Sequence, residues 1–257
     1  MKSNVNWIGL WTFVRRESQR FLRVPVQTLV TPWISAVLYI VIFGFVVGSK
    51  IDLIAGVRYI DFVLPGILMM NLIAASFSQT SSSIFFQRFA RHIEEILVVP
   101  LSHFEMITGY VIGGIIRGIV VGLGVFLIAV FFSAASLEHF GIFLFYILSV
   151  SVVFSLVGII VGLWAEQFEH LNVLNVFVIL PLSFLGGVFN SITMLPEKIQ
   201  PIMQFNPFFY FIDGIRYSMI GVSESNLLVG VVLIFVLIIG LGFLTGYLFN
   251  RGWRLRE

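Results

Sequence analysis

The chain has 257 residues, of which 59% are apolar and only 11% are charged. An average soluble domain carries roughly 25% charged residues, so water could not solvate this surface on all sides. These proportions exclude a soluble enzyme, a disordered regulator and a nucleic-acid-binding protein, and the absence of cysteine excludes disulfides and thiol chemistry. The composition therefore predicts an all-α, polytopic membrane protein.

Residues 1–23 predict an amphipathic helix that lies in the plane of the membrane interface. The apolar stripe of this helix comprises Trp7, Leu10, Trp11, Val14, Phe21 and Leu22, whereas Arg15, Arg16, Gln19, Arg20 and Arg23 lie largely off it. A basic face combined with an aromatic face is typical of helices at the membrane surface. The pattern leaves two functions open, a simple topology anchor and a lever beside a cytoplasmic partner.

Six long runs are apolar enough to cross a membrane. A helix needs about 20 apolar residues to cross a hydrocarbon core of about 30 Å. The predicted spans are Val24–Ser49, Phe62–Gln87, Met106–Leu137, Phe140–Ala165, Leu171–Pro196 and Ser225–Asn250. Strands of a membrane β-barrel would instead alternate in polarity over about 10 residues, which these runs do not. We therefore expect six transmembrane helices.

The loop at 87–105, between the second and third predicted spans, has helical character. The residues that define it are Arg91, Glu94, Glu95, Leu97 and Pro100. Opposite charges at spacings of three and four support a helix, which the proline ends. A solvated loop helix would explain the charges alone, but the exposed apolar ridge would be costly in water and favours docking against a partner.

The third predicted span combines a glycine face with a charged residue near mid-membrane. Gly114, Gly118 and Gly122 are four residues apart and share one face, where another backbone can approach closely. Packing within one subunit, a substrate path and a dimer seam all fit this pattern. Arg117 lies roughly 16 Å along the helix, at a depth where an arginine costs at least about 2.5 kcal/mol. We expect it to contact a polar cavity or free carbonyls, as a structural residue or in the route of an anionic cargo.

The stretch at 191–224 is predicted to be an outer re-entrant segment rather than a seventh span. The candidate seventh span within it, Ile202–Val222, contains Asn206, Pro207, Asp213 and Arg216, a composition unsuited to contact with lipid. Six spans place both termini in the cytoplasm with ten basic residues, against four outside. A seventh span would move the basic C-terminus outside, contrary to the positive-inside tendency.

Two stretches of the sequence are similar to catalytic or nucleotide-binding motifs, but neither has the complete pattern. Glu166–His170 has a glutamate where an inverted zinc motif needs its first histidine, and Gly44–Lys50 is one residue too short for a phosphate loop. We expect this chain to contain no catalytic residue, no metal site and no cofactor of its own.

Several stretches in chain order resemble the membrane subunit of bacterial ABC-2-type exporters. They are Ile93–Pro100 (IEEILVVP), Gly109–Gly118, Leu185–Phe189 and Asn206–Tyr210 (NPFFY), followed by Arg216 and Tyr217. The resemblance covers residues 1–257 as one transmembrane domain. It implies that 87–105 is the coupling helix of the permease, and that 191–224 is a paired re-entrant helix that includes Tyr210.

The resemblance also implies partners and a location. Two copies of a separate ATPase subunit would supply ATP and Mg, and a second copy of the permease would complete the transporter in the bacterial inner membrane. Membrane lipid would surround it, and the cargo would be a drug, an antibiotic or a lipid-linked polysaccharide. A six-span secondary transporter or channel without an ATPase is the alternative, although such carriers usually place acidic groups at membrane depth. A structural scaffold is a third possibility.

Overall fold

A computed structural model describes residues 6–51, 53–90, 101–132 and 137–254. Within these residues, six helical segments are long and apolar enough to cross a membrane. They are Val26–Val47, Tyr59–Phe89, His103–Phe132, Phe140–Trp164, Phe168–Leu185 and Leu227–Asn250. The predicted all-α class and the six spans are confirmed. Residues 91–100, which carry the predicted coupling residues, lie outside the described part of the chain.

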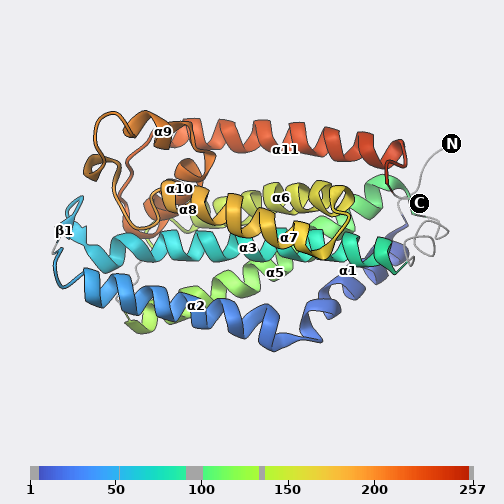
Figure 1. The fold of residues 1–257 in the computed structure, drawn as a ribbon, viewed down its shortest axis with the longest axis horizontal. Helices are drawn as coiled ribbons and strands as arrows, with labels where there is room; N and C mark the ends of the chain where they lie inside the picture. Colours follow the sequence, from blue (N-terminus) through green and yellow to red (C-terminus); the bar gives the residue numbers. More distant parts are fainter. Residues whose placement is uncertain (1–5, 52, 91–100, 133–136, 255–257) are drawn as a thin grey trace.

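The second span, α3 (Tyr59–Phe89), forms the centre of the bundle (Figure 1). It packs mainly against α5 (His103–Phe132) and α6 (Phe140–Trp164). Residues 62–75 of α3 are apolar on all sides apart from Asn71, so burial on every face is the stable arrangement there. In its most apolar window 83% of the residues are buried, compared with 11% in α11 (Leu227–Asn250), which lies at the outside.

The first and fifth spans each contain a π-helical stretch that ends two residues before a proline, and the first span has a second π-helical stretch, η2, at its C-terminal end. The first span consists of η1 (Val26–Val30), α2 (Thr31–Tyr39) and η2 (Ile40–Val47), and the fifth of α7 (Phe168–Leu174), η3 (Asn175–Ile179) and α8 (Leu180–Leu185). Pro32 and Pro181 have no N–H to donate to the preceding turn. The residue before each proline instead bonds five residues back, which widens the helix by one residue.

The N-terminal helix α1 (Trp7–Leu22) is amphipathic as predicted, but its apolar residues do not all share one environment. Leu10, Val14 and Phe21 are buried against the bundle, where α1 packs on α5, whereas Trp7 and Trp11 are exposed. The predicted stripe is therefore divided: one edge of it packs against the bundle, and the other edge, with both tryptophans, is not covered by the rest of the chain.

The end of the bundle opposite to α1 holds a short β-hairpin and three short helices (Figure 1). Strands β1 (Leu53–Ile54) and β2 (Val57–Arg58) pair across a turn with positive φ at both central residues. The helices are η4 (Ile192–Met194), α9 (Gln200–Phe205) and α10 (Pro207–Ile220).

The fifth span ends at Leu185 rather than at the predicted Pro196. Gly187 adopts φ +86, a left-handed conformation that turns the chain out of the helix. The residues that follow belong to the loop, so the predicted boundary was about three turns too late.

Candidate functional site

The predicted coupling residues Arg91, Glu94, Glu95, Leu97 and Pro100 lie outside the described residues, but both flanks of their loop are well defined. On the N-terminal flank of the loop, Arg88 at the end of α3 donates to three carbonyl oxygens at the end of α6. The distances from Nη1 are 3.0 Å to Gly162, 2.7 Å to Leu163 and 3.1 Å to Ala165. A cation placed over free carbonyls stabilises a helix C-terminus, so the start of the loop is fixed to α6.

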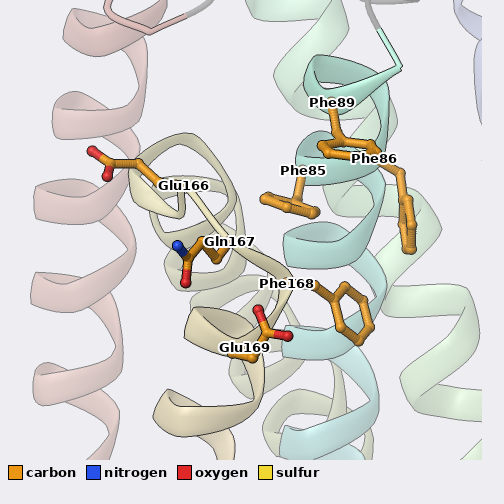
Figure 2. A pocket seen from close by; sticks show the side chains of 7 residues that line it. All are labelled: Phe85, Phe86, Phe89, Glu166, Gln167, Phe168 and Glu169. Atoms are coloured by element: carbon orange, nitrogen blue, oxygen red, sulfur yellow. The ribbon is translucent and has the colours of Figure 1, made fainter.

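An apolar cavity of about 380 Å³ lies beside this flank (Figure 2). Its lining residues are Phe85, Phe86, Phe89, Glu166, Gln167, Phe168 and Glu169. Figure 2 shows the carboxylate of Glu166 directed away from the phenyl rings. It forms an ion pair of 2.8 Å with Arg254. The cavity is large enough for an apolar side chain or a small organic molecule.

The glycine face of α5 packs against helices of the same chain. A Cβ at Gly118 would collide with the hydroxyl of Ser76 on α3 and would lie 3.0 Å from the hydroxyl of Ser151 on α6. Gly114 meets Ser155 and Thr80 in the same way, while Gly122 has only ordinary contacts, with Leu72 at 3.5 Å. These glycines allow three helices to approach closely within one subunit.

Arg117 is buried on the same helix and points toward α3. It is 8% exposed, and its Nη1 lies 3.4 Å from Gln79 Oε1. Among the described residues its Nε has no hydrogen-bond partner. Within the described residues no ion pair joins it to a carboxylate, so its charge is only weakly compensated.

A group of polar residues joins α1, α3 and α5 around Arg117, and we call it the Glu17 network. Its members are Glu17, Arg20, Gln79, Ser83, Gln87, Tyr110 and Arg117. Arg20 Nη2 donates to the backbone oxygen of Gln79 at 2.5 Å, and Tyr110 donates to the side chain of Gln87. Burial lowers the pKa of the Arg20 guanidinium, and Glu17 offsets part of this effect.

The predicted re-entrant residues Asn206, Pro207, Tyr210 and Arg216 lie in α10 or cap it, at the end of the bundle that holds the β-hairpin (Figure 1). Asn206 caps α10 by accepting the N–H of Phe208 at 3.1 Å, and it donates to the carbonyl of Leu182 at 2.6 Å. Pro207 occupies the first turn of α10, where its missing N–H costs nothing. Tyr210, further along α10, is placed beside Gly230 of α11.

Arg216 is fully buried within this region and contacts three segments of the chain. It donates to the carbonyls of Phe62 at 3.2 Å and Gly187 at 2.5 Å, and its guanidinium lies 3.7 Å from the ring centroid of Phe62. Its Nη1 lies 3.6 Å from Glu224 Oε2 and 3.9 Å from Asp213 Oδ1. Asp213, also fully buried, accepts the backbone N–H groups of Glu224 and Ser225.

The sequence did not predict that Glu17 and Asp213 are buried. Glu17 lies three residues after Val14 and four before Phe21, so its place on the packed stripe of α1 was visible in the spacing. For Asp213 the spacing to Arg216 was visible, but the partner loop was not. No cluster of His, Asp and Glu in the described residues could hold a metal ion.

Comparison with known proteins identifies the family to which this chain belongs. Residues 9–220 match the family model described as ABC-2 type transporter. The chain is 37% identical over 251 residues to the inner membrane transport permease YadH of Escherichia coli (strain K12), covering 98% of each chain. It is 24% identical over 241 residues to nodulation protein J of Rhizobium leguminosarum bv. viciae, covering 91% of this chain and 90% of the relative. The chain therefore belongs to the ABC-2 type transporter family, as a multi-pass transport subunit of the inner membrane.

Proposed function

We propose that this chain is the permease of an ATP-driven exporter, and that a separate ATPase binds the loop between α3 and α5. The observation that carries the proposal is the family match over residues 9–220, in a chain whose own sequence has no phosphate loop. The loop contains an apolar ridge with charged residues, and its N-terminal flank is fixed to α6 by Arg88. Because the start of the loop is bonded to α6, a soluble partner that displaces the loop would also displace the helices of the bundle.

The orientation in this proposal places both termini in the cytoplasm. The described start of α1 and the end of α11 lie at the same end of the bundle (Figure 1). The basic residues of that end include Arg15, Arg16, Arg20, Arg88 and Arg251. Because cytoplasmic loops are enriched in Lys and Arg, this end faces the cytoplasm and the hairpin end faces outward. Residues 191–224, including α9 and α10, then enter the membrane from outside.

The exporter works as two permeases with two ATPases. The first and last spans have only 11% of their apolar windows buried, so lipid or a second permease must cover them. The relative YadH is named a transport permease, which supports transport by this chain as well. The cargo is drug-like, lipid-linked or a polysaccharide, and the cavity at Phe85 and Phe168 is a suitable contact for its apolar part.

Co-expression with the candidate ATPase subunits of the host tests the proposal. Native mass spectrometry of the purified complex should show two permeases with two ATPases, and vesicles containing it should transport cargo only with ATP. A permease with Leu97→Asp should lose the ATPase, whereas Leu97→Met, which keeps an apolar side chain at the same position, serves as the matched control. Transport by the permease alone, driven by an ion gradient, would contradict the proposal and favour a secondary transporter.

A further inference from the structure

One carboxylate lies on the face of α1 that packs against the bundle. Glu17 shares this face with Phe13, Val14 and Phe21, and only 1% of it is exposed. A carboxylate buried to this extent is costly unless hydrogen bonds and opposite charges compensate it. The positive charges come from its own helix, with Arg16 at 3.2 Å and Arg20 at 3.7 Å.

Three hydrogen bonds from α3 hold Glu17 in this position. Ser83 Oγ donates to Oε2 at 2.6 Å, and Gln87 Nε2 donates to Oε1 at 3.1 Å. Gln79 Nε2 donates to the backbone oxygen of Glu17 at 3.0 Å. Residues 79, 83 and 87 are four apart and lie on one face of α3. Glu17 thus fixes α1 to the last turns of α3, directly before the loop that joins α3 to α5.

The beginning of α1 is fixed to the helix on the other side of that loop. The N–H of Asn6, which caps α1, donates to Glu105 Oε1 at 2.6 Å. Glu105 lies in the first turn of α5, and its Oε2 accepts the N–H of Ser102 at 2.6 Å. Helix α1 therefore bridges the two helices that the predicted coupling loop connects.

The other end of α1 leads into the first span. Thr28 Oγ1 donates to the carbonyl of Phe21 at 2.7 Å, so the start of η1 is attached to the last turn of α1. The first span has 11% of its apolar window buried, compared with 83% for α3. A span with so few buried residues resists displacement less than the central helix does.

We propose that Glu17 is a positioning residue that fixes α1 to the end of α3, while the cap residue Asn6 fixes α1 to the beginning of α5. A displacement of the coupling loop by the ATPase then reaches the first span through α1. The inference rests on the proposed function, because it takes this loop as the ATPase contact. Gly113, further along α5, allows this close approach, since a Cβ there would lie 3.0 Å from Glu17 Cβ and would require a small shift of α1.

The test measures the position of α1 and the coupling in the same complex. The chain has no cysteine, so Gln19→Cys and Ala90→Cys accept spin labels that report the distance between α1 and the end of α3 in lipid nanodiscs. Glu17→Ala should broaden this distance distribution. It should also lower the cargo transported per ATP about tenfold, the size expected when hydrogen bonds to a charged group are lost. Binding of the ATPase should stay unchanged.

Two further variants separate positioning from general stability. Glu17→Gln keeps the shape and one acceptor oxygen, so it should restore part of both readouts. Ser83→Ala removes the 2.6 Å hydrogen bond without touching α1, and it serves if Glu17→Ala fails to fold. Ser78→Ala, on α3 but outside the Glu17 network, is the matched control.

Two results would overturn the inference. One is an unchanged distance distribution in Glu17→Ala and Ser83→Ala, since α1 would then be held by other contacts. The other is a broadened distribution with unchanged transport per ATP, since coupling would then not use α1. Failure of the proposed function is seen separately, because the wild-type chain would then transport without any ATPase.

Discussion

Replacement of Arg216 by methionine should strongly destabilise the hairpin end of the protein. The variant loses two hydrogen bonds to carbonyls, at 3.2 and 2.5 Å, and leaves Glu224 buried without its cation. Removing one partner of a buried ion pair costs about 3–5 kcal/mol. For a chain of this size each kcal/mol lowers the midpoint of thermal unfolding by roughly 2–4 °C, so Arg216→Met should lower it by roughly 6–20 °C.

The matched control is Arg58→Met, which removes an ion pair that is shorter but exposed. Arg58 Nε lies 2.7 Å from Asp61, and 60% of the Arg58 side chain is accessible. Exposed pairs contribute about 0–1 kcal/mol, because water screens them. The burial of the ion pair, rather than the distance between its charged atoms, should therefore decide which variant is destabilised.

The assay is thermal unfolding of the purified protein in detergent, followed by tryptophan fluorescence. A double variant, Arg216→Met with Glu224→Gln, should recover part of the loss because the charge on Glu224 is then removed, while Asp213 keeps the backbone N–H groups of Glu224 and Ser225 as donors. Equal midpoints for Arg216→Met and Arg58→Met would refute the reasoning. So would a double variant that is less stable than Arg216→Met alone.

Three further predictions concern topology, coupling and the cargo route. Cysteines introduced at Lys50 and Lys198 should react with impermeant reagents from outside in intact cells, and labelling only after permeabilisation would contradict the six-span orientation. Charge reversal at Glu94 or Glu95 should lower transport-stimulated ATP hydrolysis while membrane insertion stays normal; a fully coupled double variant would show that this loop does not transmit the signal. Arg117→Ala should reduce export of an anionic cargo in a vesicle assay and Arg117→Lys should partly restore it, whereas normal export by Arg117→Met would remove this residue from the mechanism.

The spans could be predicted from the sequence because length and apolar composition alone decide whether a helix crosses a membrane. Their ends were less certain, since the end of the fifth span depends on a left-handed glycine that no run of apolar residues reveals. The six predicted runs nevertheless correspond one to one with the helical spans of the described chain. The polytopic fold was therefore accessible from composition.

The partners of buried charges were not accessible in the same way. The sequence marked Arg117 and Arg216 as unsuited to lipid, but it could not show that Gln79 faces the first and that Gly187 and Glu224 face the second. A helical stripe also does not say whether it meets lipid or protein. Glu17 was passed over for that reason, although its spacing placed it on the buried face of α1.

The π-helical stretches of the first and fifth spans determine where the chain can lose a residue without disturbing the bundle. Each π-turn holds one residue more than an α-turn, so deleting one residue there restores a regular helix and leaves the flanking faces in place. The same deletion inside α3 would rotate the rest of that helix by about 100° and separate Gln79, Ser83 and Gln87 from α1. Single-residue deletions should therefore be tolerated at Val26–Val30 and Asn175–Ile179, and rejected in the central helix.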